Sequence, residues 1–374
     1  MTGSSQPLVS IVTPVFNEEE HLAECIQSVL AQTYCEWDYT IVNNCSTDAS
    51  LDIARCYAAR DSRIRIHDND RFLEMLPNHN LAVRQISPGS KYCKVVLADD
   101  VIFPECVEKM VSLAEAHPSL GIVSSYRLYG EEVHSTGLPY WVTVAGGREV
   151  CRQSFLRGLS LFGTQTSVLY RADLVRRRDP FYHEWDIHAD TEVCFALLGE
   201  ADLGFVHQVL TFTRPRPGST DVICSDIGTR NRSRLDLLTT YGRKWLSEAE
   251  YAQCLDRELS QYYRFLGRRW FVERDRGFWA YHSKAFADAG ITFSRTRLAR
   301  AAVSGVCSSV LDLRGTLDSI GRLARLREMR NADRRRSVLQ TAREPRRLTP
   351  AAAGVAHNPE ILDLPPSGGN RPPR

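Results

Sequence analysis

The 374-residue chain combines 43 % apolar with 25 % charged residues, which excludes a mostly disordered protein. Its formal net charge of +2 is unevenly distributed, because residues 314–347 contain eleven arginines and four acidic residues. The preceding part of the chain is mildly acidic, which argues against a nucleic-acid-binding domain. The basic segment is expected either to be solvated or to make peripheral contact with anionic lipid.

Three further features lead us to expect a cytoplasmic protein. No apolar stretch reaches the ~18 residues of a membrane-spanning helix. The first ten residues, MTGSSQPLVS, lack the basic and apolar regions of a secretory signal. The eleven cysteines are odd in number and form no C-x-x-C pair, so we expect reduced, mostly buried thiols. The expected location is the cytoplasm, with the inner membrane face as the alternative.

The first half of the chain alternates apolar runs with helical patterns. Residues 8–14 form a strand pattern that stops at a proline, and helical spacing follows over residues 18–32. Further strands are predicted at residues 38–44, 63–67, 92–98 and 121–125, with helices opening at Ser46-Thr47-Asp48 and after Pro104. This alternation predicts an α/β fold with a largely parallel sheet flanked by helices.

The second half of the chain is less regular at first and then helical. Residues 129–152 contain several glycines and are expected to be a loop-rich connection. Strand patterns follow at residues 166–171 and 203–207, on either side of a predicted helix at residues 188–198. We expect one α/β domain over residues 1–225, a helical extension over 226–343 and a disordered tail over 344–374.

Polar residues collect where the predicted parallel strands end. Ligands of such sheets bind beyond the carboxyl ends of the strands. Those ends carry Pro14-Val15-Phe16-Asn17-Glu18, Asn43-Asn44 and Asp99-Asp100. Two adjacent carboxylates repel each other, and a divalent cation with nucleotide phosphates would relieve that repulsion. The alternatives are a helix N-cap for the acidic pair, ahead of residues 101–110, and a plain turn for the asparagines.

Common phosphate-binding and hydrolase motifs are missing from the sequence. No G-x-G-x-x-G follows the first strand, and neither G-x-x-x-x-G-K-[ST] nor G-x-S-x-G occurs. The sequence therefore disfavours ordinary dinucleotide binding, P-loop chemistry and the α/β-hydrolase reaction.

Three segments together resemble the opening of family-2 glycosyltransferases of the GT-A fold. They are VSIVTPVFNEEEHLAECIQSVLAQTY, YTIVNNCSTDAS and YCKVVLADDVIFPECVEKMV, and the resemblance extends over about residues 8–215. It implies that Pro14, Val15, Phe16, Asn17, Glu18, Asn43, Asn44 and Asn78 help to hold a nucleotide-sugar donor. It also implies that Asp99 contacts the donor and that Asp99 and Asp100 bind Mg²⁺ or Mn²⁺ at the diphosphate.

Two departures from the family pattern affect the donor and the metal. Asn43-Asn44 replaces the D-D that usually follows the second strand, so the hydrogen-bonding pattern toward a base differs. Leu97 replaces the first acidic residue of D-x-D-D, which implies a weaker metal site.

The segment FYHEWDIHADTEVCFALL resembles the part of the family that contributes the catalytic base. The resemblance places Asp190 in that role, although Ala189 replaces the glutamate that usually precedes it. A carboxylate within hydrogen-bond reach can take the proton of an acceptor hydroxyl. The alternative role for Asp190 is stabilisation of its helix N-terminus, and His188 and Glu192 are the neighbouring candidates for the base.

These features predict an inverting, metal-dependent glycosyltransferase that uses a nucleotide-sugar donor. Its expected acceptor is a glycan or a lipid-linked saccharide, and its expected pathway is polysaccharide or glycoconjugate biosynthesis. The alternative is a catalytically weak nucleotide- or glycan-binding module of the same fold, motivated by Leu97 and the Asn43-Asn44 pair.

Overall fold

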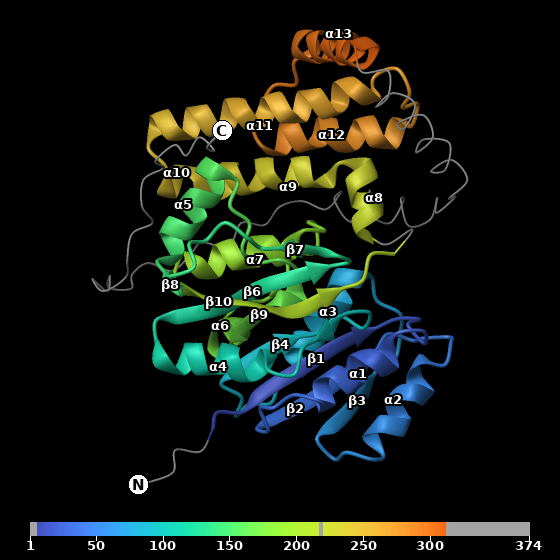
Figure 1. The fold of residues 1–374 in the computed structure, drawn as a ribbon. Coiled ribbons are helices and arrows are strands. Elements are labelled where there is room, and N and C mark those ends of the chain that lie inside the picture. Colours follow the sequence, from blue (N-terminus) through green and yellow to red (C-terminus); the bar gives the residue numbers. More distant parts are fainter. Residues whose placement is uncertain (1–5, 217–219, 312–374) are drawn as a thin grey trace. The chain divides into compact units, whose positions relative to one another are not determined.

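The computed structural model describes residues 6–216 and 220–311, which form two compact units (Figure 1). The first, here called the sheet unit, contains the chain up to Tyr182 and then Asp190–Arg214. The second, the helical unit, contains His183–Ala189 and the described residues between Pro215 and Leu311. Each unit is described separately below.

The sheet unit is built on one sheet of ten strands in the order β3-β2-β1-β4-β9-β6-β10-β5, with β7 beside β6 and β8 beside β10. The strands are β1 (Val9–Val15), β2 (Trp37–Asn43), β3 (Ile64–Asp68), β4 (Tyr92–Val95), β5 (Val101–Ile102), β6 (Leu120–Tyr129), β7 (Glu132–His134), β8 (Val144–Ala145), β9 (Val168–Arg171) and β10 (Asp202–Thr213). The first four are mutually parallel, and so are β6 and β10. The short strands β5, β7, β8 and β9 pair antiparallel, so the sheet is mixed.

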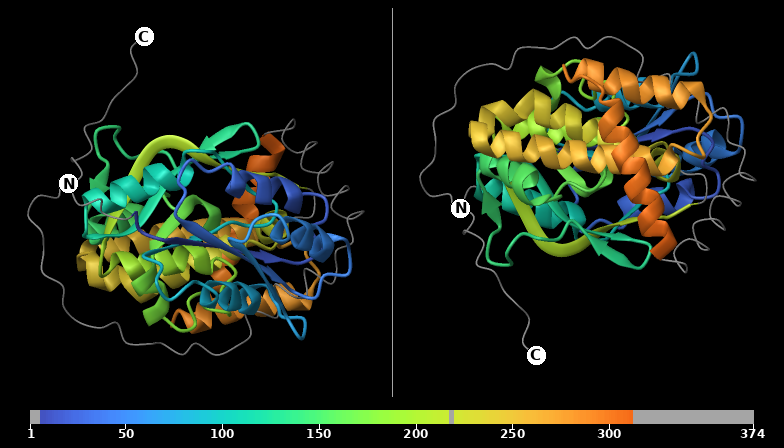
Figure 2. Two further views of the ribbon diagram at one scale, coloured as in Figure 1. Left: turned by 90° about the horizontal axis from the view of Figure 1, so that it is seen from below. Right: turned by 90° about the horizontal axis from the view of Figure 1, so that it is seen from above.

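The strands carry apolar side chains on both faces of the sheet, and helices cover the sheet for that reason. The helices of this unit are α1 (Leu22–Leu30), α2 (Ser50–Ala58), α3 (Met75–Arg84), α4 (Cys106–Ala116), α5 (Gly147–Arg157), α6 (Ala172–Arg177) and α7 (Ala189–Leu198, whose first residue belongs to the helical unit). Ile26 of α1 and Met110 of α4 pack with Ile11 of β1 and Tyr39 of β2 in one buried cluster. Figure 2 shows these helices in two further directions.

The helical unit consists of α8 (Thr220–Ile227), α9 (Thr229–Leu237), α10 (Arg243–Trp245), α11 (Glu248–Arg269), α12 (Arg276–Asp288) and α13 (Arg295–Leu311), with a π-helical turn η2 (Leu238–Gly242) before α10. Its core is aromatic and includes Tyr262, Phe278 and Phe286. A capping box fixes the start of α11, where the Ser247 hydroxyl accepts from the Glu250 N–H. Gly267 allows α11 to approach α13, since a Cβ there would lie 2.7 Å from the Ala301 carbonyl carbon.

The predicted α/β class and helical C-terminal region are confirmed, with three local corrections. Val101–Ile102 is a strand and α4 starts only at Cys106, so the helix N-cap interpretation of the acidic pair is wrong. Residues 129–152 are not only loop, because β7, β8 and the first turns of α5 fall within them. The sheet is less parallel than expected, because β9 inserts antiparallel between β4 and β6.

Several sequence-based predictions concern residues outside the described ranges. The basic segment 314–347 and the tail 344–374 both lie there. Within residues 6–216 and 220–311, no helix combines the length and the apolar composition needed to cross a bilayer. The ten cysteines described there are all free thiols.

Candidate functional site

The carboxyl ends of β1, β2, β3 and β4 lie at one edge of the sheet (Figure 1), because these strands are parallel and neighbours. The chain turns sharply after two of them. Asn17, after β1, has φ 51°, and Cys45, after β2, has φ 57°. Left-handed backbone at residues other than glycine is costly and collects at functional sites, so this edge is a candidate site.

The β1 and β2 loops are bound to each other through Asn17 and Glu18. The Asn17 side-chain oxygen accepts from the Thr47 N–H at 2.8 Å, and the Asn17 N–H donates to the Ser46 hydroxyl. The Glu18 N–H donates to the Ser50 hydroxyl at 2.8 Å. These bonds fix the two loops as one rigid rim.

The side chains of Pro14 and Val15 lie inside the sheet rather than on this rim. Both are buried within β1. The Val15 carbonyl accepts from the Asn44 N–H at 2.8 Å. These two buried residues therefore support the rim and fix its position.

The side-chain amides of Asn43, Asn44 and Asn78 form hydrogen bonds within the protein. Asn43 donates to a carboxylate oxygen of Asp68 at 2.7 Å. Asn44 pairs with the backbone of Leu73, donating to its carbonyl at 2.7 Å and accepting from its N–H at 2.9 Å. The Asn78 side-chain oxygen accepts a hydrogen bond from Asn69. All three side chains are nearly buried, so they hold the loops that line the edge in place.

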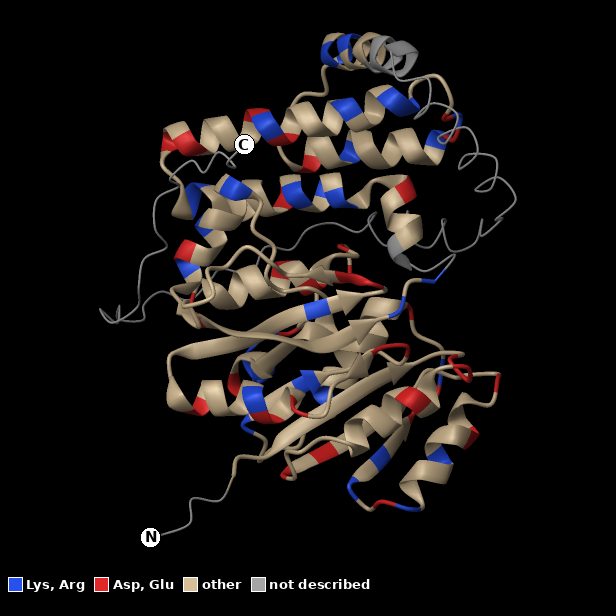
Figure 3. Ribbon diagram, viewed as in Figure 1, with Lys and Arg blue, Asp and Glu red and all other residues tan. Residues whose placement is uncertain are grey.

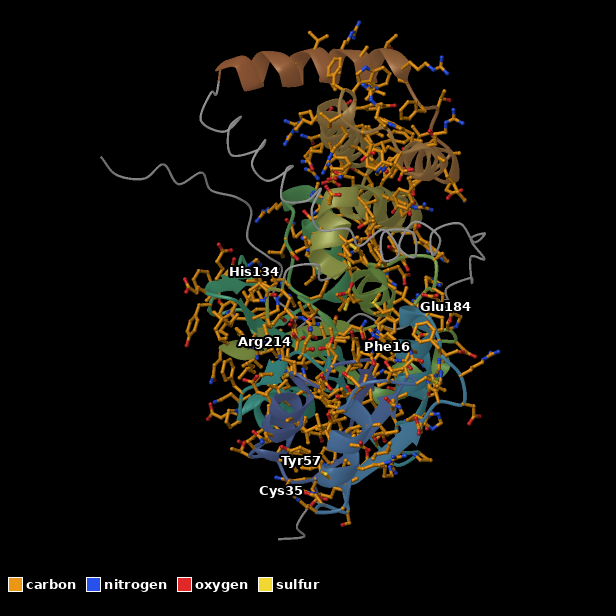
Figure 4. The ribbon with its side chains drawn as sticks, turned by 90° about the vertical axis from the view of Figure 1, so that its right-hand side faces the viewer. Phe16, Cys35, Tyr57, His134, Glu184 and Arg214 are labelled. Atoms are coloured by element: carbon orange, nitrogen blue, oxygen red, sulfur yellow. The ribbon has the colours of Figure 1, made fainter. Side chains whose placement is uncertain are left out.

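An exposed aromatic pair lies beside this asparagine network. Phe16, labelled in Figure 4, follows β1 and is 42 % exposed, and Phe72 is 50 % exposed. Their ring centroids are 4.9 Å apart in an edge-to-face arrangement. Two large apolar rings on a polar rim offer a flat ligand a stacking surface.

The acidic pair follows β4, and its two carboxylates differ in environment. Asp99 is half-buried, whereas Asp100 is 1 % exposed. Asp100 accepts a 2.5 Å hydrogen bond from the Thr166 hydroxyl through Oδ2. Burial and the charge of Asp99 raise the pKa of Asp100 to about 7, although the Thr166 hydrogen bond acts in the opposite direction.

The other oxygen of Asp100 is suited to a cation. Asp100 Oδ1 is buried and accepts no hydrogen bond from the residues that the structure describes. In that same part of the chain, no three His, Cys, Asp or Glu side chains converge as a ready metal site. Any ion held by the two carboxylates would take its remaining ligands from phosphate and water, which is how Mg²⁺ is commonly held.

Thr166 and Lys94 form a support behind the acidic pair that sequence reasoning missed. Thr166 lies in the 3₁₀ turn η1 (Gln165–Ser167), and its hydroxyl also accepts from the Leu97 N–H at 3.0 Å. Lys94 of β4 is fully buried and donates to the Thr166 and Val168 carbonyls. Burial lowers the pKa of Lys94. The only sequence signal for this support was a lysine inside an apolar strand run, which is unusual in a buried strand.

The three candidates for the base differ in their surroundings. Glu192 is buried and forms an ion pair with Arg178. His188, in the helical unit, hydrogen-bonds the Thr229 hydroxyl at 2.8 Å. Asp190 is half-buried in the first turn of α7, where its Oδ1 accepts from the Thr191 N–H at 2.7 Å.

A chain of side chains leads from η1 toward Asp190. Gln165 hydrogen-bonds the His79 ring at 2.9 Å, and the His79 ring lies edge-on to Tyr182. Burial raises the pKa of Tyr182 well above its usual value, and the charge of Asp190 adds to that rise. The contacts from η1 thus extend through His79 to the buried Tyr182.

Sequence comparison relates much of the sheet unit to known proteins. Residues 10–179 match the sequence profile of glycosyl transferase family 2. This chain is therefore similar to family-2 glycosyltransferases over residues 10–179, here called the family-2 domain. The matched segment contains the β1, β2 and β4 ends and Thr166, and it ends before Asp190.

Relatives and solved structures resemble this family-2 domain to different extents. "Putative glycosyltransferase EpsE" of Bacillus subtilis (strain 168) is 31 % identical over 170 residues, which are 43 % of this chain and 60 % of EpsE. "Glycosyltransferase GlyG" of Streptococcus pneumoniae serotype 4 is 25 % identical over 33 % of this chain and 40 % of its own length. The aligned segments thus span less than two thirds of these relatives.

The fold also resembles that of TarS from S. aureus. The structure of TarS residues 1–349 in complex with UDP-GlcNAc has a TM-score of 0.56 and 18 % identity, covering 80 % of this chain and 88 % of that one. This similarity confirms the GT-A-like fold of the family-2 domain.

Proposed function

We propose that this protein is an inverting glycosyltransferase that moves a sugar from a nucleotide-sugar donor to a hydroxyl acceptor in polysaccharide or glycoconjugate synthesis. The observation that carries the proposal is the buried Asp100 carboxylate beside Asp99, at the sheet edge that also holds the β1 and β2 loops. The TarS complex with UDP-GlcNAc supports a nucleotide-sugar donor, since TarS shares the fold. EpsE and GlyG support transfer of a glycosyl group.

In this proposal the donor lies along the rim of the sheet. The nucleobase stacks on Phe16 and Phe72, and the Asn17 and Asn43-Asn44 loops shape the nucleoside pocket. Asp99 and Asp100 would hold a divalent cation at the diphosphate. Such a cation, when bound, offsets the negative charge that develops on the leaving group.

The chain's own contribution to the chemical step is proton removal by Asp190. The acceptor hydroxyl gives its proton to the Asp190 carboxylate while its oxygen attacks the anomeric carbon of the donor. The bond from that carbon to the diphosphate oxygen breaks, and the diphosphate leaves with the electron pair. The anomeric configuration inverts because attack and departure occur on opposite faces.

Asp190→Asn tests the proposed base with little structural disturbance, because an asparagine oxygen can still accept from the Thr191 N–H. Transfer should fall by about 10²- to 10⁴-fold, the usual contribution of a general base. Binding of UDP or GDP with Mn²⁺, measured by calorimetry, should change little. Asp202→Asn is the matched control, since Asp202 accepts from the Gly147 N–H at the start of α5 in the same way.

The alternative, a weak binding module, predicts nucleotide binding without transfer. If the wild type binds a nucleotide sugar and transfers from none of a panel of UDP- and GDP-sugars, the module interpretation is favoured. If Asp190→Asn loses nucleotide binding as well as transfer, Asp190 belongs to the donor site and not to the base.

A further inference from the structure

Three consecutive apolar residues are exposed where α11 passes into α12 in the helical unit. Trp270 is 42 % exposed, Phe271 55 % and Val272 54 %, and we call these three residues the WFV tip. Single exposed apolar side chains are ordinary, but three large ones in succession on a soluble surface indicate a binding surface.

The WFV tip is held in a defined conformation. The Val272 and Glu273 N–H groups donate to the Arg269 carbonyl at 3.1 and 2.8 Å, which closes the chain into a turn at the end of α11. The Trp270 ring lies edge-on to Trp279 with centroids 5.9 Å apart, and the Trp279 indole donates to the Glu273 carbonyl. The fold therefore presents these side chains outward from a fixed turn.

Exposed arginines flank the tip in the sequence. Arg264 and Arg268 lie one helical turn apart on α11, and Arg274 and Arg276 follow the tip. Figure 3 shows basic segments along α11 and at its junction with α12.

The acidic residues next to the tip accept hydrogen bonds from nearby backbone N–H groups. Glu273 accepts from the Asp275 N–H at 2.9 Å, and Asp275 caps α12 by accepting from the Gly277 N–H at 2.7 Å. These carboxylates stabilise the turn and the start of α12.

We propose that the WFV tip and its four arginines form a docking surface for an anionic lipid bilayer. Aromatic side chains favour the bilayer–water interface, and arginines beside them attract anionic headgroups while their stems lie along the apolar layer. A second copy of the chain fits less well, since a stable protein interface buries about 800 Å² on each partner, far more than three side chains offer. The inference is independent of the proposed glycosyl transfer.

Vesicle flotation of the full-length chain tests the proposal. The protein should float with vesicles of phosphatidylglycerol and phosphatidylcholine, and much less with phosphatidylcholine alone. The triple variant Trp270→Ser, Phe271→Ser, Val272→Ser should lose most of this binding. Arg268→Gln with Arg274→Gln should weaken it by about fivefold for each cation removed, and high salt should mimic that loss.

Two controls separate the tip from other causes. Tyr140→Ser with Trp141→Ser removes aromatics that are 76 % and 73 % exposed in the sheet unit, and it should leave flotation unchanged. Circular dichroism checks that each variant is folded. Undiminished flotation of a folded triple variant would overturn the proposal and transfer the binding to another basic segment. A change in oligomeric state by light scattering, with flotation unaltered, would identify the tip as a contact between copies.

Discussion

Replacing Asn44 by aspartate should destabilise the protein, although aspartate is the usual family residue at this position. Asn44 is 2 % exposed, and its NH₂ group donates to the Leu73 carbonyl at 2.7 Å. Its oxygen accepts from the Leu73 backbone N–H at 2.9 Å and from the side-chain NH₂ group of Asn69 at 3.0 Å. In the variant the oxygen bonds are retained, but a carboxylate oxygen takes the place of the donor and faces a carbonyl oxygen.

The cost follows from that single exchange of donor for acceptor. Loss of a buried hydrogen bond and desolvation of the unpaired acceptor together cost about 2–4 kcal/mol of unfolding free energy at neutral pH. Protonation would restore a donor, so the pKa of the new carboxyl should be raised in the folded state. A group whose pKa is raised in the folded state stabilises the fold when the pH is below its unfolded pKa, here about 3.9. This stabilisation is lost as the pH rises through the folded-state pKa. The deficit should therefore be small near pH 4 and grow toward pH 7.

Urea unfolding of wild type and Asn44→Asp at acidic and neutral pH measures this difference. Asn17→Asp is the matched control in the same region, because Asn17 is exposed and its oxygen remains an acceptor for the Thr47 N–H. Its effect should be within about 0.5 kcal/mol, as is usual for surface changes. Equal stability of Asn44→Asp and wild type at neutral pH would show that the Leu73 pairing does not hold this loop.

Two further predictions concern buried hydrogen bonds. Thr166→Val removes the hydroxyl that donates to the buried Asp100, so it should lower the unfolding free energy by about 1.5–3 kcal/mol and weaken Mn²⁺ binding, measured by electron paramagnetic resonance. Thr166→Ser keeps the hydroxyl and should retain both properties. Equal Mn²⁺ affinity of the two variants would contradict a role of Thr166 in positioning Asp100. In the helical unit, burial lowers the pKa of His282 to about 3, so His282 should contribute a fall of about 2–3 kcal/mol in unfolding free energy between pH 6.5 and 4.5, because at this site only the unfolded chain takes up the proton. His282→Asn should reduce the pH slope of the unfolding free energy by about one proton in urea titrations, whereas a slope equal to that of wild type would place the titration at another group.

Local sequence patterns determined the order and type of most elements and indicated the strand ends as the candidate site. The apolar run before Pro14 marked β1, and the helical spacing after Glu18 marked α1. These predictions succeed because strand and helix periodicities are properties of neighbouring residues. The strand ends could be placed at one edge because parallel strands joined by helices must share their direction.

Only the tertiary structure decided what the polar side chains at that edge contact. Asn44 pairs with Leu73, Asp100 with Thr166 and Glu192 with Arg178, each across a separation in sequence that no periodicity records. The sequence could not tell an asparagine that faces a ligand from one that fastens a loop, because both need the same amide at a strand end. Which of the two roles an asparagine takes depends on how distant segments pack. Packing leaves certain buried backbone groups without a hydrogen-bond partner, and a nearby side-chain amide then supplies that partner.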